Sequence, residues 1–131
     1  MKAALALVLA LFVGGCVTIP ATRDGEDPAK TFRTSVGFMQ MGDCLYEKVR
    51  VFWLQNSPDT IPKTDLAEEV RFEQQIPLSY AVGHGWTISV RATSQNTSEV
   101  RLFEGQRGFN RGAELYDDAL PRFVRECDAK H

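Results

Sequence analysis

The chain has 131 residues, of which 44% are hydrophobic, and its 15 basic and 17 acidic side chains give a formal net charge of -2. This length suits a single domain with a real hydrophobic core. Nucleic acid is not an expected partner, because affinity for it depends on many lysine and arginine contacts to phosphate.

The amino end has the composition of a secretory signal. Lys2 supplies a positive charge, residues 3–13 contain only alanine, leucine, valine and phenylalanine, and Gly14 and Gly15 supply small side chains. The apolar run is too short for a transmembrane helix, which needs about 20 residues. Residues 1–15 are therefore expected to be a signal peptide that is removed.

The segment Val13-Gly14-Gly15-Cys16 resembles the lipobox of bacterial lipoproteins, in which an aliphatic residue and two small residues precede a cysteine. The resemblance implies that Cys16 carries a diacylglycerol group, that the chain is cut before it and that the new amino group is acylated. Several acyl chains hold a protein stably in a membrane. The alternative is an ordinary secretory signal with a cysteine at its cleavage point.

Val17, in place of an aspartate, resembles the outer-membrane lipoproteins of Gram-negative cells, so the domain is expected to face the periplasm. The whole pattern resembles the small lipoproteins of proteobacteria. If Cys16 is lipidated, Cys44 and Cys127 are the two remaining cysteines, and they lie in an oxidising compartment. We therefore expect a disulfide between them; two buried free thiols are the alternative.

Residues 16–30 are polar, with two prolines and mixed charges, and are expected to form a flexible tether that leads from Cys16 to a single periplasmic domain of residues 31–131.

A long amphipathic helix is expected over residues 31–54. Apolar side chains recur there at intervals of three and four, at Phe38, Met41, Leu45, Val49 and Phe52. The competing interpretation is a strand in "KVRVFW", where Val49, Val51 and Trp53 would share one face.

Three strands are expected after this helix. Apolar and polar residues alternate in 69–76, 86–92 and 99–104, and "TSQNTS" between the last two predicts a hairpin turn. One face of this antiparallel sheet is expected to be wet.

A short carboxy-terminal helix is expected to complete the domain. Leu120, Phe123, Val124 and Cys127 fall at helical spacing, and Asp117 or Asp118 would cap the helix start. Pro121 would lie in the first turn, where its missing amide hydrogen costs little. The bridge from Cys44 to Cys127 would then hold this helix beside the long one, on the same side of the sheet. The expected fold is α+β: a small antiparallel sheet of about three strands, covered on one face by the two helices.

No catalytic residue, metal site or cofactor site is predicted. His84 lies between glycines in "GHGW", but its one histidine companion is the last residue, and no spacing typical of metal ligands is present. A loop that needs glycine torsions explains this motif better. Asp117 and Asp118 could imitate paired catalytic carboxylates, but adjacent residues of a helix point in different directions.

The segment "RLFEGQRGFNR" is the candidate interaction surface. It interleaves basic and aromatic side chains, as contact surfaces for proteins or glycans do: Arg101, Phe103, Arg107, Phe109 and Arg111. Phe103 would point away from the face of Val100 and Leu102 and be exposed. The alternative is a solvated loop with Phe109 tucked over the sheet edge.

The sequence favours a lipid-anchored, non-enzymatic module of the cell envelope that binds another envelope protein through its sheet face or this segment. An inhibitor or a binder of a small ligand or glycan, which needs a concave pocket, is the second interpretation. A hydrolase is the third, and it would require a carboxylate and a nucleophile near His84.

Overall fold

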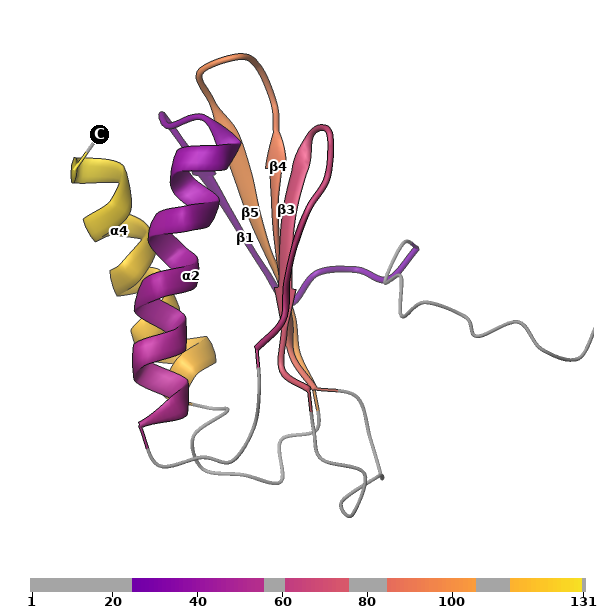
Figure 1. Cartoon of the computed structure of the whole chain (residues 1–131), viewed down its shortest axis with the longest axis vertical. Helices are drawn as coiled ribbons and strands as arrows, with labels where there is room; N and C mark the ends of the chain where they lie inside the picture. Colours follow the sequence, from indigo (N-terminus) through magenta and orange to yellow (C-terminus); the bar gives the residue numbers. More distant parts are fainter. Residues whose placement is uncertain (1–24, 56–60, 76–84, 106–113, 131) are drawn as a thin grey trace, which may run out of the picture.

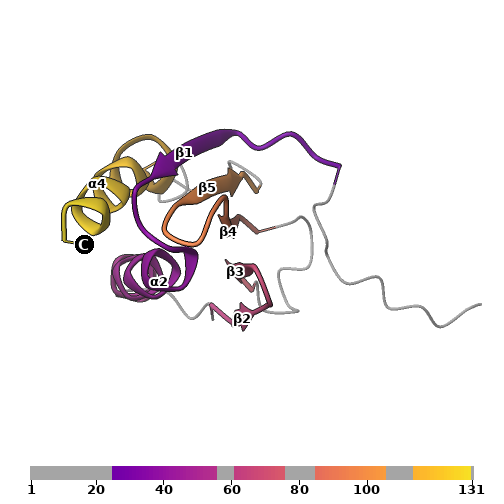
Figure 2. The same cartoon turned by 90° about the horizontal axis from the view of Figure 1, so that it is seen from above.

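Five antiparallel strands form one sheet, and two helices lie side by side on the same face of it (Figures 1 and 2). This is the arrangement in a computed structural model, which describes residues 25–55, 61–75, 85–105 and 114–130. The strand order is β1-β5-β4-β3-β2. The elements follow the chain as β1 (Lys30–Thr34), α2 (Phe38–Leu54), β2 (Lys63–Asp65), β3 (Glu69–Glu73), β4 (Thr87–Ala92), β5 (Ser98–Phe103), the π-helical turn η2 (Leu115–Ala119) and α4 (Leu120–Lys130). The predicted α+β class is confirmed.

The number of strands was predicted too low, and the start of the long helix too early. Residues 30–34 form edge strand β1, which pairs with β5 along its whole length, and the Ala29 amide donates to the Leu102 carbonyl over 2.8 Å. Gly37 has an extended ψ of 150°, so the helix begins at Phe38. This start coincides with the first position of the apolar helical stripe.

The second additional strand, β2, has three residues and pairs with β3 at the opposite edge. It is too short and too polar to show alternation. The other three strands lie within one or two residues of their expected places, except that β3 ends at Glu73. The hairpin of β4 and β5 is confirmed by six paired positions, from Thr87 opposite Phe103 to Ala92 opposite Ser98.

Helix α2 buries its apolar stripe against the sheet. Met41, Leu45 and Val49 have no exposed surface, whereas Val51 is 55% exposed. The competing strand in "KVRVFW" is therefore wrong, because it would place Val51 on the same face as Val49. At Gly42 the helix approaches β3 so closely that a Cβ atom would lie 2.7 Å from the Cβ of Val70.

The aspartate cap of the last helix was not borne out. Asp117 and Asp118 are exposed and lie inside the π-helical turn η2, which runs directly into α4. Neither end of this turn has a side-chain cap. The helical segment starts before the two aspartates, so their position cannot be a cap. Asp117 instead lies 3.4 Å from Lys30, at the start of β1.

Helices α2 and α4 are joined by Cys44 and Cys127, whose sulfur atoms lie 2.08 Å apart, with 5.9 Å between their Cα atoms. This geometry is compatible with the expected disulfide. The rings of Phe52 and Phe123 meet edge to face nearby, with centroids 6.0 Å apart.

Candidate functional site

The face of the sheet opposite the helices is polar, and we call it the outer face. Ile88 and Val90 of β4 are fully buried in the core, so their neighbours in the strand point the other way. No helix of the described segments covers this side (Figure 2). Alternation and strand register place the following side chains on it: Thr31, Arg33, Thr64, Glu69, Arg71, Glu73, Thr87, Ser89, Arg91, Glu99, Arg101 and Phe103.

Glu69 is the centre of a charge cluster on the outer face. It is 7% exposed, and its Oε2 accepts a hydrogen bond from Arg91 Nε and a second one, of 3.0 Å, from the Ser89 hydroxyl. Arg71 Nη2 lies 2.7 Å from Oε1 as an ion pair. The carboxylate thus holds two guanidinium groups close to the sheet surface.

The environment of Glu69 lowers the pKa of its carboxyl group. Burial acts in the opposite direction and would raise this pKa, because it disfavours the charged form. The hydrogen bonds from Arg91 and Ser89 and the positive charges of Arg71 and Arg91 outweigh burial. Glu69 is therefore ionised at neutral pH.

Arg101 lies at the centre of β5 without such a partner. Its Cζ atom is 5.3 Å from the centroid of the Phe103 ring, within the range of a cation–π contact. The Nε–H group is buried and has no hydrogen-bond acceptor. Among the described residues, no carboxylate forms an ion pair with Arg101.

Phe103 lies on the predicted side of the strand, but it is 4% exposed, so its predicted exposure is wrong. The guanidinium of Arg101 lies over its ring, and Thr87 stands opposite it on β4. The remaining candidates of this segment, Arg107, Phe109 and Arg111, lie outside the described residues. Cys16 and His84 lie outside them as well.

The Glu69 cluster could not be identified from the sequence. The alternation in "EVRFE" and "TISVRA" places Glu69 and Arg91 on polar faces of their strands, but nothing local to either strand shows that they meet. That contact depends on the register of β3 against β4, which pairs Glu69 with Arg91 across 22 residues of chain.

Depressions lined by described residues lie at two places. One, of about 340 Å³, lies beside the Glu69 cluster and is lined by Leu66, Glu68, Glu69, Arg71, Arg91 and Ala92. Leu66, in the turn between β2 and β3, is 48% exposed and gives this depression an apolar rim.

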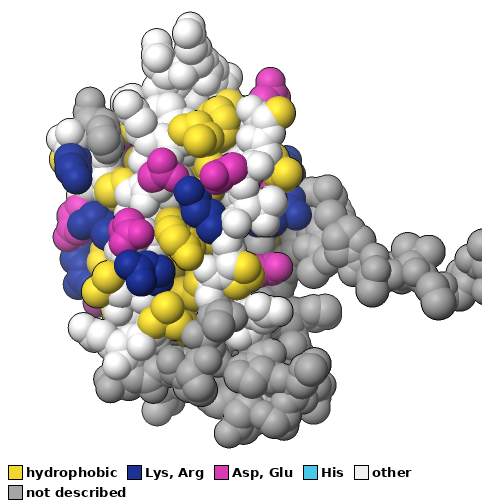
Figure 3. Space-filling model, viewed as in Figure 1, with side chains coloured by type: hydrophobic (Ala, Val, Ile, Leu, Met, Phe, Trp, Pro, Cys, Tyr) yellow, Lys and Arg dark blue, Asp and Glu magenta, His cyan; other side chains and the backbone are white. Residues whose placement is uncertain are grey.

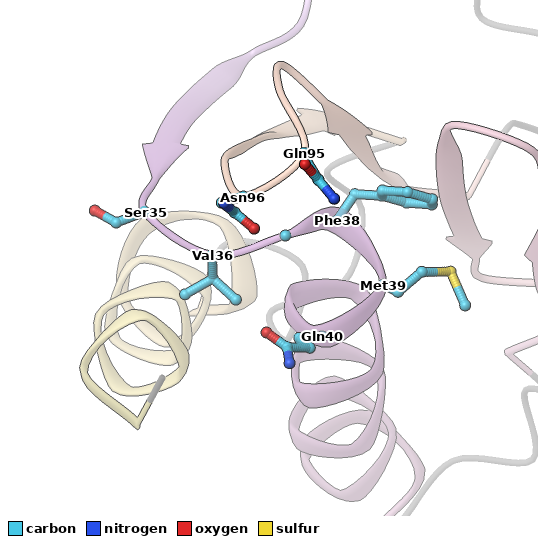
Figure 4. A pocket seen from close by; sticks show the side chains of 8 residues that line it. Ser35, Val36, Phe38, Met39, Gln40, Gln95 and Asn96 are labelled. Atoms are coloured by element: carbon cyan, nitrogen blue, oxygen red, sulfur yellow. The ribbon is translucent and has the colours of Figure 1, made fainter.

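The other depression, of about 500 Å³, lies at the start of α2. Gln95 and Asn96 of the β4–β5 turn project towards the first turn of the helix, and Met39 points outwards (Figure 4). The remaining lining residues are Ser35, Val36, Gly37, Phe38 and Gln40. None of these side chains is charged, so this depression offers no acid or base for catalysis.

The face that α2 forms with the β2–β3 edge of the sheet has a different character. In its described part, charged side chains of both signs alternate with apolar ones, without a large region of one sign (Figure 3). Lys48 and Glu126 bridge α2 and α4 over 2.8 Å, and Arg50 pairs with Glu47 over 2.9 Å. These exposed pairs contribute little to stability.

Within the described ranges, no three histidine, cysteine, aspartate or glutamate side chains are grouped so that they could hold a metal ion. Over the same ranges, no helix has the length and apolar character needed to cross a bilayer.

A comparison with models of known protein families gives no match for this chain, and a comparison with curated proteins gives none either.

Proposed function

We propose that the protein is a lipid-anchored, non-enzymatic module of the bacterial cell envelope, and that it binds another envelope protein through the outer face of its sheet. The observation that carries this proposal is the contrast between the two faces. One is covered by α2 and α4, while the other displays ordered guanidinium groups that no described helix covers.

One further observation supports the envelope location. The cysteine pair joins α2 to α4, as in proteins that mature in an oxidising compartment.

The anchor is tested by Cys16→Ser. Wild-type protein should sediment with membranes and carry the mass of its acyl chains, whereas the variant should lose this mass and appear in the soluble fraction. A variant that stays in the membrane fraction, with a mass that differs only by the substitution, would contradict lipid anchoring.

Site-specific photocross-linking tests which face binds the partner. A benzoylphenylalanine at Arg33, which is exposed on the outer face, should give a defined heteromeric adduct in intact cells. The same group at Glu47, which is exposed on α2, is the control and should give none. Equal adducts from both positions, or monomer alone from both, would count against the proposal.

A binder of a small uncharged ligand or glycan is the second candidate, favoured by the uncharged depression of about 500 Å³ at the start of α2.

A further inference from the structure

One row of the outer face contains hydroxyl and guanidinium groups and no carboxylate. Strand register aligns five residues directly across the whole sheet, in the order Thr64, Arg71, Ser89, Arg101 and Thr31. Neighbouring strands lie about 4.8 Å apart, so the two arginines start roughly 10 Å from each other. We call these five residues the central row.

The two arginines of the central row differ in their partners. Arg71 forms an ion pair with Glu69, and Ser89 donates to the same carboxylate. Arg101 has the ring of Phe103 beneath it, and its buried Nε–H has no acceptor. Buried donors in proteins nearly always have an acceptor. Because the Nε–H is buried, a ligand would reach Arg101 through its terminal Nη groups, which form no ion pair with a carboxylate of the described residues.

We infer that Arg101 is the binding position for a carboxylate side chain on an extended segment of the partner protein. A guanidinium matches a carboxylate through paired, charge-assisted hydrogen bonds. The exposed Thr31 stands beside Arg101 and adds an uncharged hydroxyl, whereas the Ser89 hydroxyl on the other side is buried and donates to Glu69. This inference rests on the proposed function and adds the chemistry of the partner.

The neighbouring row argues against a broad anionic surface as the ligand. It alternates in sign across four strands, from Glu69 through Arg91 and Glu99 to Arg33. Its two carboxylates cancel the charge of its two arginines, so this row gives a broad anionic membrane no net attraction. A single carboxylate at Arg101 needs only that one guanidinium, so an acidic peptide segment fits the outer face better than a lipid surface does.

The test uses the full chain, labelled with ¹⁵N, in zwitterionic detergent micelles. The probe is the peptide acetyl-Gly-Glu-Gly-amide, and its Gln counterpart is the matched control. The Glu peptide should give a saturable shift of the Arg101 side-chain Nε–H signal and of the Ser89 and Phe103 amide signals. The Gln peptide should give none of these shifts.

Arg101→Gln should weaken the binding of the Glu peptide about tenfold or more, as expected for a charge-assisted hydrogen bond. Arg101→Lys keeps the charge and should lose part of the affinity. Arg125→Gln changes an exposed arginine of α4 and should bind as wild type does. The amide spectra report in the same samples whether each variant is folded.

Three results would overturn the inference: equal shifts with both peptides, no saturable shift with the Glu peptide, or unchanged affinity for it in folded Arg101→Gln. A response to phosphatidylglycerol vesicles that exceeds the response to the peptide and is lost in Arg101→Gln would assign Arg101 to lipid phosphate and would also overturn it. In either case, a cross-link from Arg33 to an envelope protein would leave the proposed function standing.

Discussion

Opening the bridge between Cys44 and Cys127 should lower the free energy of unfolding substantially. The two cysteines are 83 positions apart. For a closed loop of this size, the chain-entropy model gives about 4.5 kcal/mol, and native bridges commonly contribute about 2–4 kcal/mol. We therefore expect reduction to cost about 2–4.5 kcal/mol, which is a large part of the stability of a domain of this size.

Urea unfolding of the protein with and without a reducing agent measures this effect. Reduction keeps both sulfur atoms, so the packing around fully buried Cys127 changes little. The double variant Cys44→Ser, Cys127→Ala is the control. It should resemble the reduced protein and should not respond to the reducing agent. Alanine is chosen at position 127 because a serine hydroxyl would be buried there.

A wild-type unfolding midpoint that does not move on reduction would refute this reasoning. It would mean that the cysteines are not bridged, or that the unfolded chain gains no freedom when they separate. Mass spectrometry after thiol alkylation of the urea-unfolded protein distinguishes these two cases, because a bridged protein takes up no label at these positions before reduction, whereas free thiols do.

Two further predictions concern the sheet. Gly42→Ala should lower the free energy of unfolding by about 1–3 kcal/mol, because its Cβ would overlap Val70. In the control variant Gly37→Ala, the new Cβ would meet its nearest atom at 3.4 Å, so the loss of stability should be smaller. Equal urea midpoints for the two variants would contradict this. The lowered pKa of Glu69 adds stability that is complete above the ordinary glutamate pKa, near 4.5, and is lost as the pH falls through the lower, folded-state value. Glu69→Gln should therefore lower the free energy of unfolding by about 1–3 kcal/mol at pH 7. Below pH 4.5, the melting temperature of this variant should fall less steeply with pH than that of wild type. An equally steep fall would contradict the role of Glu69.

The helix layer was largely predictable because its signal is local. The stripe from Phe38 to Phe52 has helical spacing, and the residues around Cys127 repeat it, so periodicity alone locates α2 and α4. The edge strands lack such a signal. Phe32 is the one apolar side chain of β1, and β2 has none, so both depend on pairing with a neighbour for their conformation.

The outer face was predictable only in part, for a related reason. Alternation in β5 correctly places Arg101 and Phe103 on one face of the strand and Val100 and Leu102 on the other. The burial of Phe103 and the contact of Glu69 with Arg91 depend on which residues stand opposite in the next strand. A polar strand face in the sequence therefore does not show whether its charged side chains are solvated or form ion pairs with their neighbours.

The order of these side chains bears directly on binding. On a freely solvated sheet face, the small side chains between long arginines would be accessible, yet Ser89 is 1% and Thr87 2% exposed. Both side chains are therefore covered, and Arg71, held by Glu69, is itself 19% exposed along its side chain. Immobilising a flexible side chain at an interface costs about 0.5–1.5 kcal/mol, and a guanidinium that is already held avoids part of this cost. Burial of an ion pair is weak evidence for stability. Under the proposed function, the Glu69 cluster would hold the outer face in the arrangement that binds the partner, and Arg101 would receive its carboxylate.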